Sequence, residues 1–228
     1  MVSGSSATAL RVSAIYASIL GESTFAGWPG VIVRLAGCPL RCVWCDTPEA
    51  RTGGEPLTLS QIFERVAGFE IPLVLLTGGE PLAQAGSRFL ISMLLSRGLR
   101  VIVETGGGAS IEGVDPRACL ILDVKCPDSG MQARQVGENL ERLKPTDELK
   151  FVLASRRDYE WARGFITQGD WASRLVVHFS PVEPGPSVPA GLGVARRELA
   201  EWILADRLPV RLNLQQHVWI WGEGAKNV

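Results

Sequence analysis

Short apolar runs alternate along the chain with segments in which apolar residues recur every three or four positions. Several runs are almost continuously apolar, which is typical of strands buried on both faces of a parallel sheet. Thr58, with Gln61 three residues later, forms a capping-box pattern before one helical segment. The alternation predicts an α/β fold, either a barrel or an open doubly wound sheet. Expected strands cover residues 11–17, 31–35, 73–77, 100–105, 119–125, 148–154, 174–180 and 210–216, and expected helices cover 58–66, 87–98, 134–143, 158–169 and 194–207.

The length and composition indicate one globular unit. Of the 228 residues, 1–10 have no signal-peptide features and are expected to be a flexible lead-in, and 11–228 a single domain. A formal net charge of −1 gives no basic field for nucleic acid, and no apolar run approaches the roughly 20 residues that span a bilayer. Five cysteines without a secretory signal favour a reducing compartment, so a cytoplasmic location is expected.

Polar residues follow the ends of five expected strands. Because the carboxyl ends of parallel strands meet at one edge of a sheet, active sites of such folds lie there. One such residue would mean little, but five in the same position indicate a single site. The residues are Cys38, Thr77 to Glu80, Glu104, Lys125 and Ser180.

Three of the cysteines, Cys38, Cys42 and Cys45, form the pattern Cys-x3-Cys-x2-Cys in a loop after a buried strand. A tetrahedral zinc site needs a fourth ligand, and the two histidines, His178 and His217, are far away in sequence. A 4Fe–4S cluster held by three thiolates leaves one iron open, which the amino and carboxylate groups of S-adenosylmethionine can chelate. The pattern favours such a cluster, while a zinc site and incidental thiols stay open on the cysteines alone.

A second motif, Leu-Thr-Gly-Gly-Glu-Pro-Leu at residues 76–82, follows the next strand. Together with the cysteines and Trp44, it resembles the signature of the radical S-adenosylmethionine superfamily. Glycines let a backbone approach a ligand, and Glu80 can accept a hydrogen bond from the methionine ammonium. The resemblance implies that Gly78, Gly79 and Glu80 bind the cofactor.

The segment from Ile15 to Thr47 is similar to the opening of the 7-carboxy-7-deazaguanine synthase family. This resemblance implies a partial, trimmed (β/α) barrel with a mostly parallel sheet. It also implies a lyase that converts 6-carboxy-5,6,7,8-tetrahydropterin to 7-carboxy-7-deazaguanine with loss of ammonia, in queuosine and 7-deazapurine biosynthesis. An activating enzyme that installs a glycyl radical on a protein partner would share both motifs and is the alternative. A zinc- or cluster-binding structural module is a third hypothesis, which predicts no cleavage of the cofactor.

The resemblance also assigns roles to single residues, with the radical itself supplied by the cofactor. Magnesium prefers hard oxygen ligands, and a planar guanidinium suits a substrate carboxylate. The assignments are Cys38, Cys42 and Cys45 for the 4Fe–4S cluster, Thr47 for Mg²⁺, Arg34 for the substrate carboxylate, Ile19, Leu20, Gly21 and Thr77 for other substrate contacts, and Gly78, Gly79, Glu80, Asp123, Val124 and Lys125 for S-adenosylmethionine.

The expected partners are the pterin substrate, an external electron donor such as a flavodoxin, and a second copy of the chain. Neither nucleic acid nor a membrane is expected. The seven tryptophans are interpreted as core and interface residues. His178 and His217 lie in strand-like runs and are interpreted as structural, and Lys150 either approaches the cofactor or simply ends its strand.

The chain departs from the family pattern at four places that bear on these assignments. Leu20 stands where the family usually has glutamine, and Ser23 where it has a second glycine. Asp123 replaces a serine near the cofactor, and Val218 stands where lysine is common near the C-terminus. These departures concern substrate details more than the class of reaction.

Overall fold

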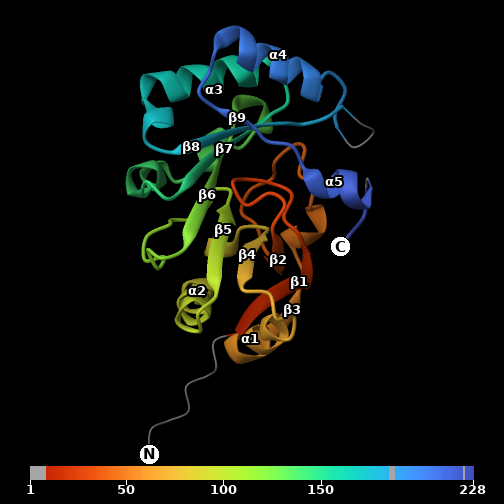
Figure 1. The fold of residues 1–228 in the computed structure, drawn as a ribbon, viewed down its shortest axis with the longest axis vertical. Helices are drawn as coiled ribbons and strands as arrows, with labels where there is room; N and C mark the ends of the chain where they lie inside the picture. Colours follow the sequence, from red (N-terminus) through yellow and green to blue (C-terminus); the bar gives the residue numbers. More distant parts are fainter. Residues whose placement is uncertain (1–8, 185–187, 223) are drawn as a thin grey trace, which may run out of the picture.

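The computed structural model describes residues 9–184, 188–222 and 224–228. Within these residues one sheet of nine strands forms the centre of the protein, in the order β3-β1-β2-β4-β5-β6-β7-β8-β9 (Figure 1). From β2 through β4 to β9 the neighbouring strands are parallel, and β1 is antiparallel to both β2 and β3. The strands are β1 (Ala9–Ile19), β2 (Pro29–Leu35), β3 (Glu55–Thr58), β4 (Leu73–Gly78), β5 (Arg100–Thr105), β6 (Cys119–Val124), β7 (Glu148–Leu153), β8 (Val176–Pro181) and β9 (Arg211–Leu212).

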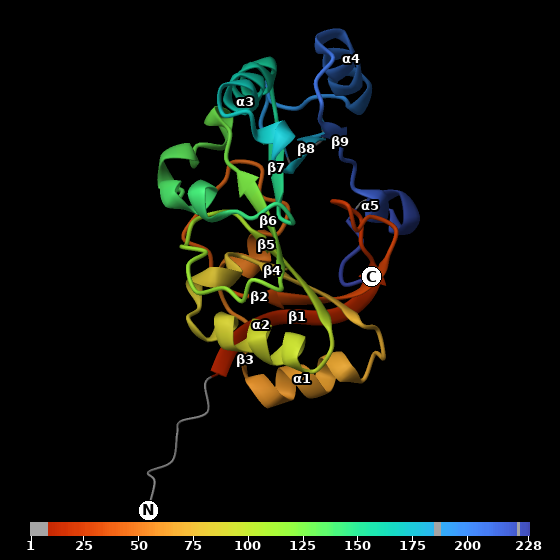
Figure 2. The ribbon, with the colours of Figure 1, turned by 60° about the vertical axis from the view of Figure 1, so that its left-hand side comes forward.

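The sheet curves without closing, because no pairing between its edge strands β3 and β9 occurs in the described part of the chain (Figure 2). Helix α1 packs on β1, α2 on β5, α3 on β7 and α4 on β9. This arrangement confirms the expected partial barrel with a mostly parallel sheet. None of the described helices has the length and apolar character to cross a bilayer. The helices are α1 (Leu59–Ala67), α2 (Gly86–Ser96), α3 (Arg156–Gln168), α4 (Arg196–Asp206) and α5 (Gln216–Trp221).

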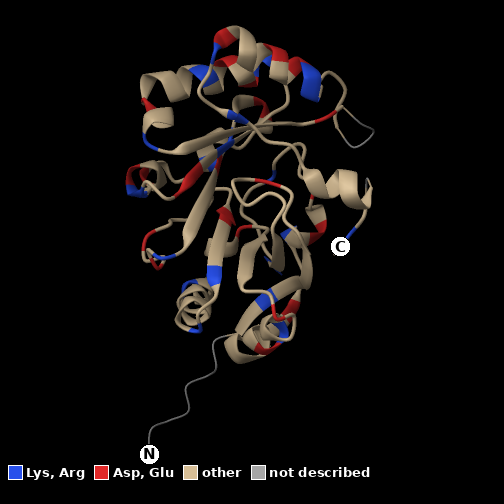
Figure 3. Ribbon diagram, viewed as in Figure 1, with Lys and Arg blue, Asp and Glu red and all other residues tan. Residues whose placement is uncertain are grey.

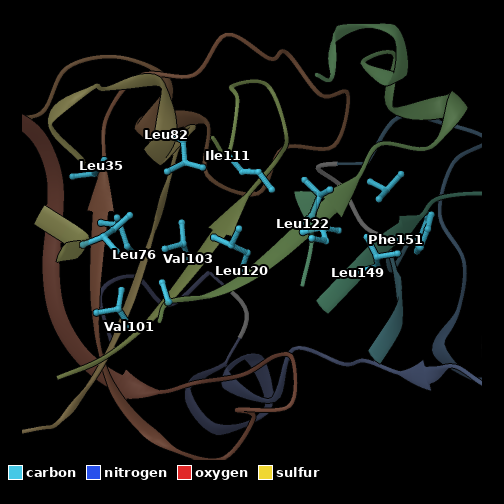
Figure 4. Packing of buried hydrophobic residues seen from close by; sticks show 14 of the residues in the cluster. Leu35, Leu76, Leu82, Val101, Val103, Ile111, Leu120, Leu122, Leu149 and Phe151 are labelled. Carbon is cyan, nitrogen blue, oxygen red and sulfur yellow. The ribbon is translucent and has the colours of Figure 1, made fainter. Parts of the chain in front are cut away.

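The outer face of the sheet forms the main hydrophobic core. Its strands contribute one buried apolar residue at every second position, as the alternation of side chains along a strand requires (Figure 4). Around β7 the core is aromatic: the centroid of the Phe151 ring lies 5.6 Å from the ring centroid of Phe165 in α3 and 5.6 Å from that of Phe179 in β8. Burial of this face against the helices leaves the remaining strand residues for the inner face.

The inner face has two layers. Toward the amino ends of the strands it is apolar, and we call this cluster of Leu20, Leu73, Ile102 and Ile121 the apolar plug. Further along the strands, toward their carboxyl ends, the inward side chains become polar. The inner polar layer, as we call it, consists of Arg34 on β2, Thr77 on β4, Glu104 on β5, Asp123 on β6 and Lys150 on β7. Register places these residues together, because Arg34 pairs with Thr77 and Asp123 pairs with Lys150 across neighbouring strands.

The helix expected over residues 134–143 is wrong. The structure has two short 3-10 helices there, Gln132–Arg134 and Gly137–Arg142. The Gln135 side chain accepts from the Lys125 N–H and donates to the carbonyls of Gly106 and Asp123, all at 2.8 Å. Because these bonds tie the backbone to neighbouring loops, the segment follows the loops and not a regular helix.

The last expected strand, residues 210–216, is mostly wrong too. Only Arg211–Leu212 pair with β8, and helix α5 follows, so His217 lies in a helix and not in a strand. The chain turns at Asn213, whose side chain points into the protein and donates to Ser180 Oγ at 2.8 Å. At the other end, β1 already includes Ala9 and Leu10, which the sequence had placed in the lead-in; residues 1–8 lie outside the described part.

Candidate functional site

The three cysteines lie in the segment between β2 and β3, residues 36–54, which we call the cysteine loop. It begins at the carboxyl edge of the sheet. Cys38, Cys42 and Cys45 are partly exposed and form no disulfide. Two guanidinium groups tie the loop together: Arg41 donates to the Leu40 carbonyl at 2.7 Å, and Arg51 donates to the Cys42 carbonyl at 3.0 Å. Burial raises the pKa of the Cys38 and Cys42 thiols. Bound iron would therefore stabilise the thiolates that the protein alone disfavours.

A cluster and a single metal ion require different spacings between the ligand side chains. Around one zinc, at 2.3 Å from each sulfur, thiolates lie about 3.8 Å apart. Among the residues that the structure describes, no three Cys, His, Asp or Glu side chains come together as a single metal ion requires. Each thiolate of an iron–sulfur cubane binds a different iron, so its sulfurs stand further apart. Three free cysteines on one loop are a donor set that suits such a cluster.

The glycine motif packs against this loop. Gly78 has a φ of +136°, and a Cβ there would lie 2.1 Å from the Leu35 carbonyl oxygen. A Cβ on Gly79 would lie 2.3 Å from the Gly37 oxygen, and the Glu80 N–H donates to that same oxygen at 2.8 Å. The sequence predicted that these glycines approach a ligand. In the structure Gly78 approaches the last residue of β2 and Gly79 approaches the backbone of the cysteine loop, so the glycines fix the two motifs to each other.

Gly78→Ala is therefore expected to destabilise the protein by about 3 kcal/mol or more, because the methyl group would collide with backbone that cannot move freely. Gly98→Ala is the matched control. Gly98 also has a positive φ, +84°, but nothing lies within 4 Å of its Cβ position, so only conformational strain of about 1–2 kcal/mol is expected. Urea unfolding of both variants measures the difference, and equal losses would contradict the packing argument.

Glu80 is fully buried within the protein. Its carboxylate accepts from the Thr105 hydroxyl at 2.7 Å, from the Leu82 N–H at 3.1 Å and from the Gly108 N–H at 3.3 Å. In this structure the side chain holds together the loops after β4 and β5, and its contact with a methionine ammonium stays a prediction. The sequence analysis did not assign Thr105 or the three glycines after it to the site, although three consecutive glycines at the end of a strand could have indicated it.

Two oxygen-bearing side chains and a guanidinium group meet just after the last cysteine of the loop. Thr47 Oγ1 donates to Asp46 at 2.7 Å and lies 3.4 Å from a guanidinium nitrogen of Arg34, which also donates to the Tyr16 hydroxyl at 3.2 Å. Burial alone would raise the pKa of Asp46, but the Thr47 hydroxyl and the Lys150 charge hold it below its usual value. An ionised carboxylate beside a hydroxyl oxygen suits Mg²⁺, and Arg34 is placed to pair with an anionic ligand.

The middle of the inner polar layer is a chain of charged contacts. Thr77 Oγ1 donates to Glu104 at 3.4 Å, and Glu104 accepts from the Lys150 ammonium at 2.7 Å. The same ammonium lies 2.9 Å from the Glu22 carboxylate, and Glu22 accepts from the Asn213 amide at 3.3 Å. Of the predicted site residues, Thr77 joins this chain directly, and Arg34 lies beside Thr77 in the register of the sheet. Glu22 was not assigned from sequence, and the role of Lys150 was left open.

The expected cofactor residues after β6 divide into two groups. Val124 is buried in the outer core, so only its backbone can reach a ligand. Lys125 pairs with Asp123 at 2.5 Å; burial alone would lower the pKa of Lys125, but the Asp123 carboxylate raises it. The second oxygen of Asp123 is buried and has no hydrogen-bond partner in the described part of the chain. A hydroxyl or amino donor of a bound cofactor fits this acceptor.

The segment Ile19–Leu20–Gly21 lies under the C-terminal part of the chain. Leu20 belongs to the apolar plug, and its backbone N–H and carbonyl bond to Trp28 and Gly27 at 2.8 Å each. The Gly21 carbonyl accepts from the Gln216 N–H at 3.1 Å, and the His217 ring occupies the space where a Cβ on Gly21 would stand. These bonds use several backbone groups of residues that were assigned to the substrate, so that assignment stays a prediction.

The assembled site offers thiols, hard oxygen atoms and cations along one edge of the sheet. The thiols suit iron, the Asp46–Thr47 pair suits magnesium, and Arg34 and Lys125 suit carboxylates. Such an arrangement can hold a cluster, a charged cofactor and a small anionic substrate side by side.

Comparison with known proteins agrees with this description. The model of the radical SAM superfamily matches residues 32–118. A 7-carboxy-7-deazaguanine synthase from Chlorobaculum tepidum is 43% identical over 222 residues, which cover 96% of this chain and 97% of that protein. One from Koribacter versatilis is 38% identical over 226 residues, covering 96% of this chain and all of that protein.

Two solved structures share the fold. The crystal structure of QueE from Escherichia coli superposes with a TM-score of 0.72 at 20% identity and covers 91% of this chain and 94% of that chain. The structure of TYW1 with a lysine–pyruvate adduct bound has a TM-score of 0.53 at 13% identity and covers 77% and 72%. At these identities the likeness concerns the fold alone.

Proposed function

Because this chain belongs to the 7-carboxy-7-deazaguanine synthase family of the radical S-adenosylmethionine superfamily, we propose that it converts 6-carboxy-5,6,7,8-tetrahydropterin to 7-carboxy-7-deazaguanine and ammonia. Members of this superfamily use a 4Fe–4S cluster and S-adenosylmethionine. When bound, these two groups supply a carbon-centred radical that abstracts hydrogen from substrate. The product is a precursor in queuosine and 7-deazapurine biosynthesis.

The observation that carries the proposal is the contact between the cysteine loop and the inner polar layer. Cys45 is followed at once by Asp46 and Thr47, and Thr47 lies 3.4 Å from Arg34 of that layer. A cluster on the loop and a substrate carboxylate at Arg34 would therefore share one site. The relatives favour the small-molecule lyase over a glycyl-radical-activating enzyme.

Each residue of the site then has a definite task. Arg34 would pair with the substrate carboxylate, and Thr77 would donate to the pterin. Thr47 would bind Mg²⁺ through the lone pairs of its hydroxyl oxygen, since its proton is directed to Asp46. Magnesium would orient the carboxylate, with substrate oxygens and waters filling its other positions. Asp123 and Lys125 would hold the polar groups of S-adenosylmethionine.

Thr47→Val keeps the shape of the side chain but removes its oxygen. We expect product formation at a fixed low Mg²⁺ concentration to fall about 10- to 100-fold and to recover partly at high Mg²⁺, because one ligand of the ion is lost. Thr52→Val, an exposed residue five positions along the same loop, is the control and should respond to Mg²⁺ like the wild type. A titration with MgCl₂ measures both, and identical curves for all three proteins would exclude Thr47 as a ligand.

The proposal extends to partners and location. The cluster needs an external one-electron donor, for which we propose a flavodoxin, and its sensitivity to oxidation fits the cytoplasm. We also propose a homodimer, because Trp28, Trp219 and Trp221 are 54%, 59% and 47% exposed, and aromatic residues are enriched at interfaces. Sedimentation of the protein at several concentrations tests the dimer.

Anaerobic turnover of reconstituted, reduced protein tests the function. With S-adenosylmethionine, Mg²⁺ and 6-carboxytetrahydropterin, mass spectrometry should detect 7-carboxy-7-deazaguanine. Formation of 5′-deoxyadenosine alone would keep the radical class but reject this substrate. If protein with a verified cluster produces neither compound, a structural module becomes the better interpretation.

A further inference from the structure

Two carboxylates and one ammonium are buried together in the inner polar layer. Lys150 lies 2.9 Å from Glu22 and 2.7 Å from Glu104, and the three side chains are only 7%, 20% and 23% exposed. One ammonium cannot neutralise two carboxylates, and burial makes an unbalanced charge costly. The cluster therefore favours a proton on one of the two acids. The other charged groups that face it are Asp46 from the cysteine loop, Arg34 from β2 and Asp123 from β6.

The two carboxylates differ in their surroundings. Glu104 accepts from the Thr77 hydroxyl as well as from Lys150; burial alone would raise its pKa, but the Lys150 ammonium lowers it below the usual value. Burial raises the pKa of Glu22 to about 7 against the attraction of Lys150, and the charge of Glu104 adds to the rise. Glu104 therefore stays ionised while Glu22 gains and loses a proton near neutral pH, the range in which a general acid–base group is effective.

The proposed reaction requires such a group. Substrate and product differ by one molecule of ammonia, so the conversion needs no net oxidant or reductant. A ring of the substrate contracts in this conversion. Ammonia leaves when a C–H bond of the contracted ring breaks and the electron pair of that bond becomes a ring double bond. The C–N bond then breaks, with its electron pair on nitrogen. The proton from carbon needs an acceptor and the departing nitrogen needs a proton, so one carboxyl group can serve both.

We propose that Glu22 is this acid–base group: its carboxylate takes the proton from the ring carbon and its carboxylic acid gives a proton to the departing nitrogen. The inference rests on the proposed function. Glu22 precedes Ser23, whose N–H donates to Asn213 Oδ1 at 2.9 Å, while the Asn213 amide donates to Glu22 itself and to Ser180. Asn213 is thus a positioning residue that aims the Glu22 carboxylate into the inner polar layer.

The neighbouring groups fit this role less well. The carboxylates of Glu104 and Glu22 raise the pKa of Lys150 although burial alone would lower it, so Lys150 stays an ammonium and cannot accept a proton. His178 is the neighbour of Lys150 on β8, but it is buried and its Nε2 lies 2.7 Å from the Glu148 carboxylate, so it is engaged with Glu148. Burial lowers the pKa of His217 below its usual value, so an effect of His217 would appear at a lower pH than that of Glu22.

The test compares wild type, Glu22→Gln, Glu22→Asp and Glu64→Gln, the last being the same chemical change on the exposed side of α1. Product formation is followed from pH 5.5 to 8.5 with S-adenosylmethionine, Mg²⁺ and 6-carboxytetrahydropterin. Wild type should gain activity as pH rises through about 7, because the proton acceptor must be ionised. Glu22→Gln should form product about 10²- to 10⁴-fold more slowly and accumulate a compound of the substrate's mass that still holds the nitrogen.

Two further readouts keep the test decisive. The infrared band of a protonated carboxyl group should be lost between pH 6 and 8 in wild type and Glu64→Gln but be absent from Glu22→Gln, whether or not cofactors are bound. Glu22→Asp keeps a carboxylate and should retain a pH-dependent part of the activity. This variant tests the acid–base role of residue 22 if Glu22→Gln does not fold.

The outcomes separate this inference from the proposed function. If wild type makes no product, the proposed function fails. If wild type makes product and Glu22→Gln keeps its rate and pH dependence, or changes only the KM for the pterin, then Glu22 is no acid–base group and the inference is overturned.

Discussion

Replacing Cys42 with alanine is expected to abolish formation of 7-carboxy-7-deazaguanine. In the proposed function three thiolates hold the cluster, and the other two cysteines, Cys119 and Cys126, lie outside the loop and cannot replace one of them. The loss of activity should exceed about 100-fold, because even residues that only hydrogen-bond to a metal ligand change metal affinity or activity by up to that factor. Iron content and the visible absorption of the reconstituted protein should fall together with activity.

Cys119→Ala is the matched control for this experiment. Cys119 begins β6 and donates to the Thr146 carbonyl at 3.1 Å; burial raises the pKa of its thiol to about 12, and the charges of Glu148 and Asp147 add to the rise. Such a thiol is inert, so this variant should keep its iron and its activity. Full iron content in Cys42→Ala, or loss of iron from Cys119→Ala, would show that the cluster is held elsewhere.

Local patterns in the sequence predicted much of this fold. The strand over residues 100–105 has the expected bounds, and the capping box of Thr58 and Gln61 begins α1. Both depend on residues close to one another in the chain. The three cysteines are of the same kind, since a metal-binding loop needs its ligands at fixed short spacings. The family and the class of reaction followed from these local features.

Contacts between distant segments could not be predicted in this way. Glu22 and Lys150 are 128 residues apart, and they meet only because the loop after β1 folds over the sheet and places Glu22 beside β7. The isolated position of Glu22 in a loop gave no sign that it would enter the inner polar layer. Gln135 and Asn213 show the same limit. The side chain of each donates a hydrogen bond to a distant segment, and there the chain leaves the helix or strand that the local sequence favoured.

The structure also explains why the chain tolerates two departures from its family. Leu20, in place of glutamine, turns into the apolar plug and not toward the inner polar layer. Ser23, in place of glycine, has a φ of 69°, which costs roughly 1–2 kcal/mol for a residue with a side chain. Its hydroxyl accepts from the Phe25 N–H at 3.2 Å and its own N–H bonds to Asn213, which offsets part of that strain.

Lys150→Met is expected to cause the largest loss of stability among variants of the inner polar layer. It removes the only ammonium within hydrogen-bond distance of Glu22 and Glu104 in the described residues and leaves two buried carboxylates without a cation. Breaking a buried ion pair in this way costs about 3–5 kcal/mol. Activity should be lost as well, since Glu22 would keep its proton at neutral pH.

The loss should depend on pH, and its direction follows from proton binding. Without Lys150 both carboxylates have a raised pKa in the folded protein, so between about pH 5 and 8 the native state binds more protons than the unfolded state. Stability then falls as pH rises. Urea unfolding should therefore show a deficit near the full value at pH 8 and a clearly smaller one at pH 5.

A second substitution decides whether charge is the cause. Lys150→Met combined with Glu104→Gln removes one of the two carboxylates that contact Lys150 and leaves the other, Glu22, which can take up one proton. Part of the lost stability should therefore return, and its pH dependence should weaken. The two residues are in contact, and their effects should therefore not add. Equal losses at pH 5 and pH 8, or a double variant less stable than Lys150→Met, would instead mean that Lys150 acts through the packing of its long side chain. In that case the Glu22 carboxylate would not owe its proton affinity to an unbalanced charge, and the role of Lys150 in tuning it would be rejected.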